Sequence, residues 1–251
     1  MRCRPELERG ILDDLAWLGL TWERPVRRQS EHFDDYRAQA ALLRQRGLLY
    51  PCFCSRRDVA AAVAQSEAKT GQAWPRDPDG APLYPGSCRA LPPVAAERRI
   101  AAGQPFSLRL AHREALASTP GPFRYQRFDR DGRESIVTAR PERWGDALIA
   151  RKEIPTSYHL SVVVDDDLQG VTHVVRGADL ETATDLHVLL QVLIGAPTPL
   201  YHYHGLVRDP AGEKLSKSLG SETLLDLRER GVTPAAIRQR LGFSSRPSSG
   251  G

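Results

Sequence analysis

Residues 158–218 constrain the fold of this chain more than any other part of the sequence. Residues 170–179 read Gly-Val-Thr-His-Val-Val-Arg-Gly-Ala-Asp, and their β-branched valines favour a buried strand that stops at Gly177. Residues 186–194 follow with apolar side chains at the helical spacing i, i+3, i+4, i+7 and i+8. A strand that feeds a helix is half of a βαβ unit, and ligands of open parallel sheets bind outside the carboxyl ends of the strands. Arg176 lies at that end and is therefore a candidate binding residue.

A lysine loop follows this unit. Lys214 and Lys217 lie in the pentapeptide Lys-Leu-Ser-Lys-Ser, in a loop opened by Pro210 and Gly212. Cations and hydroxyl groups can hold phosphate, and such a loop can close over a nucleotide. The pentapeptide alone also fits a solvated loop, so its meaning depends on the strand that ends in Arg-Gly-Ala-Asp before it.

Together, these two motifs resemble the catalytic half of class I glutamyl-tRNA synthetases, and more narrowly their short relatives, the glutamyl-Q tRNA(Asp) synthetases. The resemblance implies an α/β fold with a Rossmann-like parallel sheet, an inserted zinc-binding α+β subdomain and a short C-terminal helical annex. It implies a ligase that activates L-glutamate with ATP and Mg²⁺ and transfers it to queuosine at the wobble position of tRNA(Asp). Only residues 219–251 follow the lysine loop, which favours the short relatives, because full synthetases carry a large anticodon-binding region there.

The resemblance also implies roles for individual residues. Tyr158 and Arg176 would contact glutamate, the first as a phenol donor and the second as a guanidinium fork for a carboxylate. Lys217, and second Lys214, would contact the phosphates of ATP. The residues by themselves leave open a core tyrosine and an arginine paired with a neighbouring aspartate. The aspartates at 165–167 read as a turn or a helix cap rather than a metal site.

The resemblance predicts an N-terminal segment that this sequence does not match. In the family, a first strand and a histidine-glycine motif hold the ATP phosphates, whereas this chain opens with Met-Arg-Cys-Arg-Pro-Glu, at a point after them. A fragment, a misplaced start and a shortened protein are the alternatives. We expect weakened adenylation, because part of the phosphate cradle is lost. Residues 5–20 and 31–45 are predicted to form helices that pack on a sheet.

Three cysteines form a candidate metal site. Cys52 and Cys54 can present two thiolates from one turn, and Cys88 can supply a third after the chain folds back. Spacing alone leaves idle buried cysteines as an equal alternative, and His112 is the nearest histidine after the segment. The resemblance fills the fourth position with Tyr84 and implies a closed, structural zinc site.

The composition limits which binding partners and which cellular compartment are expected for this chain. With 35 basic and 31 acidic residues, the formal net charge of +4 permits a polyanionic partner without requiring one. No run of eighteen apolar residues and no apolar signal region occur, so we expect no membrane association. Four cysteines without an export signal favour reduced thiols or metal and a cytoplasmic location. We expect a monomer.

The segment 123–133 is a candidate RNA contact. It interleaves four arginines with three aromatic residues, namely Arg124, Arg127, Arg130 and Arg133 with Phe123, Tyr125 and Phe128. A nucleic-acid surface and a solvated hairpin with buried rings explain this pattern equally well. Tyr-His-Tyr-His at 201–204 reads as a half-buried strand, and residues 70–85 read as an exposed loop.

The predicted organisation is a nucleotide-binding domain interrupted by an insertion. Besides the short relatives, two functions stay open: a truncated glutamyl-tRNA synthetase that charges tRNA, and a non-catalytic, zinc-bearing RNA-binding remnant. The expected parts are helices of the nucleotide-binding domain at 1–50, the zinc-binding insertion at 51–144, the second half of the nucleotide-binding domain at 145–220, the helical annex at 221–243 and a disordered tail at 244–251.

Overall fold

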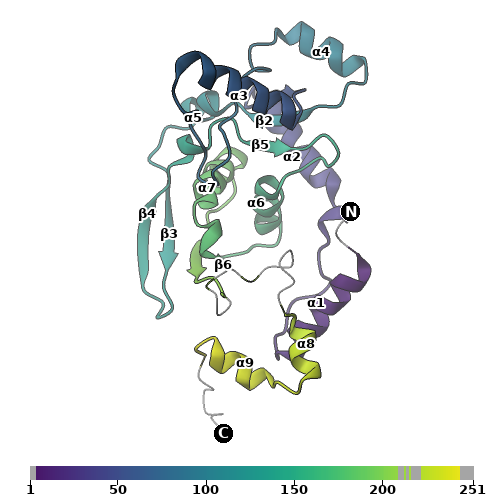
Figure 1. The fold of residues 1–251 in the computed structure, drawn as a ribbon, viewed down its shortest axis with the longest axis vertical. Coiled ribbons are helices and arrows are strands. Elements are labelled where there is room, and N and C mark those ends of the chain that lie inside the picture. The colour runs from purple at the N-terminus through teal and green to yellow at the C-terminus, as the bar shows by residue number, and fades with distance from the viewer. Residues whose placement is uncertain (1–3, 209–211, 213–214, 216–221, 244–251) are drawn as a thin grey trace. The chain divides into compact units, whose positions relative to one another are not determined.

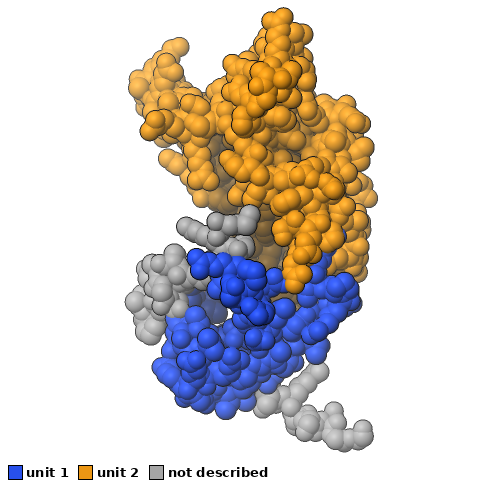
Figure 2. All heavy atoms as spheres, turned by 90° about the vertical axis from the view of Figure 1, so that its right-hand side faces the viewer, with its two compact units in different colours: residues 1–27, 207–251 blue, residues 28–206 orange. Residues whose placement is uncertain are grey.

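A computed structural model of the chain describes residues 4–208, 212, 215 and 222–243. The chain divides into two compact units, one of residues 1–27 and 207–251 and the other of residues 28–206, coloured separately in Figure 2. The predicted tail at 244–251 lies outside the described residues. None of the described helices is long and apolar enough to cross a lipid bilayer.

The larger unit contains two sheets (Figure 1). The first is antiparallel, in the order β1 (Leu49–Cys52), β2 (Ser107–Leu110), β5 (Leu148–Ala150). The second has the order β4, β3, β7, β6, in which β3 and β4 form an antiparallel hairpin and the pairs β3/β7 and β7/β6 are parallel. Its strands are β3 (Arg124–Phe128), β4 (Glu134–Thr138), β6 (His173–Gly177) and β7 (Leu200–His204). The predicted α/β class is confirmed, with one antiparallel and one mixed sheet in place of one wholly parallel sheet.

Helix α7 (Ala183–Ile194) is the centre of the core. Nearly all of its residues are buried, polar ones included, and Leu186, Leu189 and Leu190 are completely inaccessible. These leucines join the cluster formed by the first sheet with α2 (Phe33–Gln45) and α6 (Tyr158–Leu168), whereas Val188 packs on tyrosines of the second sheet. One helix thus contributes to both hydrophobic clusters.

Shorter elements complete the larger unit. Helix α3 begins at a capping box, in which the Ser55 side chain and Asp58 satisfy each other's backbone N–H groups, and ends at Gly71 in the left-handed conformation. No helix or regular strand is present between Gly71 and α4, as predicted for the exposed loop. The remaining elements are α3 (Arg56–Thr70), α4 (Pro93–Ala101), α5 (His112–Ser118) and the 3₁₀ turns η1 (Gln29–Glu31), η2 (Pro141–Trp144) and η3 (Ala178–Leu180).

The smaller unit contains α1 (Pro5–Trp17), α8 (Leu224–Glu229) and α9 (Pro234–Arg240). The Arg228 guanidinium lies 5.9 Å from the Trp17 ring centroid, and Arg238 donates to the carbonyl oxygen of Leu18 at 3.2 Å. No residue of α1 is buried, and Leu7 is 49% exposed. The prediction that both N-terminal helices pack on a sheet is therefore wrong for α1, whose contacts here are with C-terminal residues, and right for α2.

Two local predictions also need correction. The strand in 170–179 is present as β6, but it pairs only with β7 in the described sheet, and Val175 is 60% exposed. It is therefore an edge strand and not a buried one. The aspartates at 165–167 lie in the last turns of α6, where buried Asp165 accepts hydrogen bonds from Tyr36 (2.8 Å) and Gln29 (2.9 Å).

Candidate functional site

Arg176 lies at the carboxyl edge of the parallel strands, as the sequence predicted. It is the fourth residue of β6, and its register partner in β7 is Tyr203. Gly177 follows, where an added Cβ atom would collide with the carboxylate of Asp179, so a larger residue here would require the Asp179 side chain to move. This geometry places the guanidinium where ligands of α/β sheets bind.

The Arg176 guanidinium is held by uncharged acceptors. It donates to the hydroxyl oxygen of Tyr158 at 3.4 Å and to His187 Nδ1 at 3.0 Å, and it makes a short hydrogen bond to Thr184 Oγ1. Its centre lies 5.1 Å from the Tyr201 ring centroid. No carboxylate within the described ranges lies at ion-pair distance, so the alternative of an arginine paired with a neighbouring aspartate is wrong. The result is a partly buried positive charge without a carboxylate partner among the described residues.

Two histidines fix the orientation of this arginine. Because a guanidinium has no acceptor, His187 Nδ1 must accept, and its Nε2–H then donates to His159 Nδ1 at 3.1 Å. Burial, and next the charge of Arg176, lower the pKa of His159 to about 4 and hold the pKa of His187 well below its usual value. Both imidazoles are therefore neutral at pH 7, with their tautomers set by the arginine. Sequence patterns gave no signal for His159 or His187, because their roles depend on a contact between α6, α7 and β6.

Tyr158 opens α6 beside this arginine. Ser157 caps the helix by accepting from the Leu160 N–H, and the Tyr158 side chain projects from the first turn. Tyr158 is 40% exposed, and its ring centroid lies 5.6 Å from that of His187. The phenol and the guanidinium can thus be reached together from solvent. The other two predicted site residues, Lys214 and Lys217, lie outside the described residues.

The three predicted cysteines converge after β1. The Sγ atoms of Cys54 and Cys88 are 3.4 Å apart, and all three sulfurs lie within 4.8 Å of one another. The Tyr84 hydroxyl oxygen lies 3.3 Å from Cys52 Sγ and 3.4 Å from Cys54 Sγ. A tetrahedral zinc ion with bonds of about 2.3 Å to sulfur would place two sulfurs about 3.8 Å apart, so the donor set fits one such ion.

The surroundings of the cysteine cluster set its electrostatics. Burial raises the pKa of Cys54 to about 11. Burial also acts to raise the pKa of Cys88, but hydrogen bonds from Tyr84 and the Phe53 N–H outweigh it and lower the net value. The Arg109 guanidinium lies 4.0 Å from the Tyr84 ring centroid, a cation–π contact with the tyrosine of the cluster.

His112 does not join the cysteines. Its Nδ1 lies 2.7 Å from Asp146 Oδ1, and Asp146 also accepts from Tyr50 (2.5 Å) and Arg89 (3.0 Å). Burial acts to raise the pKa of Asp146, but the His112 and Tyr50 hydrogen bonds and the Arg89 charge outweigh it, so the net pKa lies below its ordinary value. This buried network ties β1 to the residues just before β5, and no local sequence pattern predicted it.

The β3–β4 hairpin places its aromatic rings inward. Tyr125 is 5% exposed and packs edge-on against Tyr201 at 5.4 Å, and Phe128 lies against His202 at 5.3 Å. Arg127 pairs with Glu181 at 2.9 Å. Of the two alternatives for residues 123–133, the geometry favours a charged hairpin with packed rings, because Tyr125 is buried and Phe128 is half-buried against His202.

Comparison with known proteins defines the class of this fold and site. The profile of the family described as "tRNA synthetases class I (E and Q), catalytic domain" matches residues 1–246, and the chain belongs to this family. A solved glutamate tRNA ligase from Elizabethkingia meningosepticum, in complex with its amino acid, is similar in fold with a TM-score of 0.71 at 22% identity. The match covers 96% of this chain and 51% of that one, so the chain spans about half the length of that ligase.

Relatives from several bacteria are called glutamyl-Q tRNA(Asp) synthetase. The one from Rhodobacter capsulatus is 45% identical, over 96% of this chain and 84% of its own length. The one from Symbiobacterium thermophilum is 36% identical, over 97% of this chain and 72% of its own length. A glutamate–tRNA ligase from Aquifex aeolicus is 32% identical, over 94% of this chain and 46% of its own length. The predicted resemblance and the ligase class are confirmed by these relatives.

Proposed function

We propose that this chain activates L-glutamate with ATP and Mg²⁺ and transfers it to queuosine in tRNA(Asp). The observation that carries the proposal is the Arg176 guanidinium, a partly buried charge oriented by neutral His187 and Thr184 and lacking a carboxylate among the described residues. A site built in this way gains affinity when an anionic ligand supplies the missing charge. Tyr158, next to the fork, supplies a hydroxyl group to the same ligand.

Activation joins a glutamate carboxylate oxygen to the α-phosphorus of ATP, and pyrophosphate leaves. The reaction needs no covalent intermediate with the protein, so the protein acts by positioning and by neutralising charge on the phosphates. Arg176 and Tyr158 would hold the amino acid. Lys217, and second Lys214, would neutralise the phosphates, a role that rests on the sequence resemblance alone.

Two acceptors are supported by the relatives. The name of the Rhodobacter capsulatus protein supports tRNA(Asp) bearing queuosine, and its 45% identity gives this acceptor the greater weight. The Aquifex aeolicus ligase, at 32% identity, supports charging of a tRNA 3′ end as the second candidate. The first reaction needs the modified base, and the second does not.

The test is ATP–pyrophosphate exchange with glutamate and no RNA, followed by transfer of labelled glutamate. We expect exchange without tRNA and transfer to tRNA(Asp) that carries queuosine, but not to unmodified tRNA(Asp) or to tRNA(Glu). Transfer to tRNA(Glu) would support the second candidate instead. Absence of both exchange and transfer would contradict both activities and leave the RNA-binding remnant.

We further infer that Cys52, Cys54, Cys88 and Tyr84 bind one structural zinc ion. Three thiolates and a phenolate oxygen form a closed set of four ligands, which leaves no position for a substrate. When bound, the ion would join the end of β1 to the loop that carries Tyr84 and Cys88. Metal analysis of the purified protein should give one zinc per chain.

A further inference from the structure

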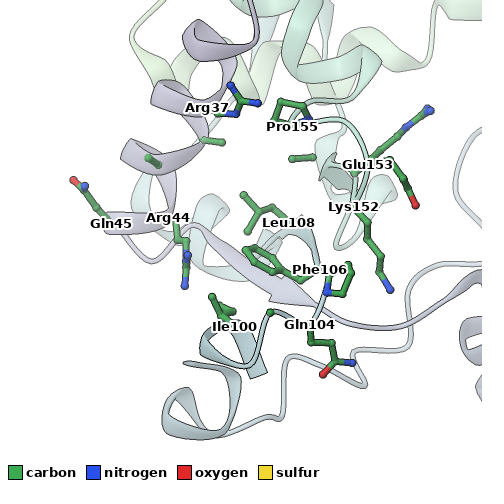
Figure 3. A pocket seen from close by; sticks show the side chains of 16 residues that line it. Arg37, Arg44, Gln45, Ile100, Gln104, Phe106, Leu108, Lys152, Glu153 and Pro155 are labelled. Carbon is green, nitrogen blue, oxygen red and sulfur yellow. The ribbon is translucent and has the colours of Figure 1, made fainter. Parts of the chain in front are cut away.

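Two neighbouring hollows lie on the larger unit, on either side of the short segment 151–153. The first, shown in Figure 3, has a volume of about 830 Å³ and is bordered by α2 and by residues 100–108. The second, of about 800 Å³, is bordered by the start of α3 and by residues of β2 and β5. The three residues of the segment line both hollows, so the hollows form one track across a shared ridge.

The lining of this track is much more basic than the chain as a whole. Glu153 is the one carboxylate among the residues that line it, whereas the chain has nearly as many acidic residues (31) as basic ones (35). The cationic lining residues are Arg37, Arg44, Arg56, Arg109, Arg151 and Lys152. Such a concentration of one sign of charge in a groove fits a polyanion.

Most of these cations are not neutralised by the fold. Lys152 and Arg109 donate to backbone carbonyl oxygens, at 2.7 Å and 2.9 Å, and neither pairs with a carboxylate among the described residues, although Arg109 also lies over the Tyr84 ring. Arg56 and Arg151 make neither a side-chain hydrogen bond nor an ion pair within the part of the chain that the structure describes. Neither charge is paired with a carboxylate among the described residues, so both can be used by a ligand.

The other two cations lie at the ends of one stripe of α2. Arg37 and Arg44 are seven residues apart, with two alanines between them on the same face, and the small side chains leave the hollow open there (Figure 3). Their partners are Asp34, whose side chain is 95% exposed, and Glu97, at 64%. Exposed pairs of this kind contribute only about 0–1 kcal/mol, so a phosphate can displace them.

The first hollow also has an apolar wall. Phe106, Leu108 and Ile100 lie between α2 and Lys152 in Figure 3. The Phe106 ring lies 6.0 Å from that of Phe53, and the Arg44 guanidinium lies 5.9 Å from it. An aromatic ring beside cations fits a nucleobase and its phosphates. A paired duplex keeps its bases inside the stack, so this hollow favours an unpaired nucleotide.

We propose that this track binds an unpaired stretch of the RNA substrate, with one base in the α2 hollow and backbone phosphates along Arg37, Arg151 and Arg56. The inference rests on the proposed function, which makes a tRNA the acceptor of glutamate. It assigns the RNA surface to α2, α3 and the β1–β2–β5 sheet, in place of the β3–β4 hairpin.

The test measures binding of fluorescently labelled, queuosine-containing tRNA(Asp) by anisotropy as the salt concentration rises. The test variant is the double substitution Arg56→Gln and Arg151→Gln, because neither side chain supports the fold. Each lost phosphate contact lowers the salt slope by about 0.7 for single strands, so we expect a slope smaller by about 1.4 and an affinity about tenfold lower near 0.15 M salt. The matched control is Arg98→Gln, an exposed arginine of α4 outside the track, which should bind as the parent does. Thermal melting of each variant checks folding.

Three results would overturn the inference. If the double variant bound tRNA with the parent's affinity and salt slope, the track would not be the RNA-binding surface, and the proposed function would still stand. An equal loss on a fully paired RNA stem would contradict the unpaired nucleotide. Failure of the parent to bind any tRNA would overturn the inference, and the glutamate exchange assay would then decide separately whether glutamate activation stands.

Discussion

The replacement Arg176→Gln tests the proposed glutamate site directly. Glutamine keeps a planar donor group that can still reach Thr184 or His187, so the fold is expected to tolerate it, but it removes the positive charge. In the structure this charge has no carboxylate partner within the described residues, and its guanidinium donates to three neutral acceptors, Tyr158, His187 and Thr184. The positive charge of Arg176 is thus the feature that a glutamate carboxylate would bind.

The expected loss follows from the kind of interaction removed. Truncating one partner of a desolvated, hydrogen-bonded charge pair costs about 2–5 kcal/mol. The fork is partly exposed, so we take about 3 kcal/mol, which corresponds to a Kd for glutamate about 150-fold higher. The Kd for ATP should be unchanged, because the phosphates are not expected to touch this residue.

Calorimetric titration of glutamate and of ATP measures both effects, and ATP–pyrophosphate exchange gives the KM values. The matched control is Arg124→Gln on β3, an exposed arginine without an ion pair in the described part of the hairpin. Glutamate binding by Arg176→Gln within threefold of the parent, in a protein that melts normally, would refute the assignment of this arginine to glutamate.

Three further changes test the surroundings of these sites. Replacing His187 by leucine leaves an Arg176 N–H without its acceptor, so the KM for glutamate should rise about tenfold while the KM for ATP stays constant. His187→Gln keeps an acceptor and should have a KM for glutamate closer to that of the parent. Exchange kinetics measure both KM values. Cys52→Ser should lower the zinc content to well below one per chain and lower the melting temperature, and full zinc with unchanged melting would contradict the metal site. Asp146→Asn should destabilise the protein by about 2 kcal/mol at pH 7, because it removes the buried carboxylate that accepts hydrogen bonds from Tyr50 and from the partly buried Arg89. The pKa of Asp146 is lower in the folded protein than in the unfolded chain, where it is near 3.9, so the carboxylate stabilises the fold above pH 3.9. This contribution disappears as the pH falls through the pKa of the folded protein. The free energies of unfolding of Asp146→Asn and the parent, measured in urea, should therefore converge in acid.

The sequence by itself determined the secondary structure where apolar residues recur at a regular helical or strand spacing. Residues 186–194 repeat at the helical spacing and form α7, and the valines before Gly177 form β6. The spacing of the cysteines correctly predicted which three sulfurs lie together. A Cys-x-Cys turn brings two of them close, and only one long loop has to fold back to add Cys88. The α3 helix was missed although Ser55 and Asp58 spell a capping box.

Burial and pairing were decided only by the tertiary structure. Valines favour a strand in any sheet, but whether β6 is central or at an edge depends on which strands stand beside it, and no local pattern encodes that. Arg176 was predicted to bind a ligand, yet its orientation comes from His187 and Thr184, which reach it only because α7 packs under the second sheet. The basic track likewise joins α2, α3 and residues 151–153, and these cations become neighbours only when the first sheet forms. Local sequence specifies which elements form, whereas the side chains that share a site are selected by contacts between elements far apart in the chain.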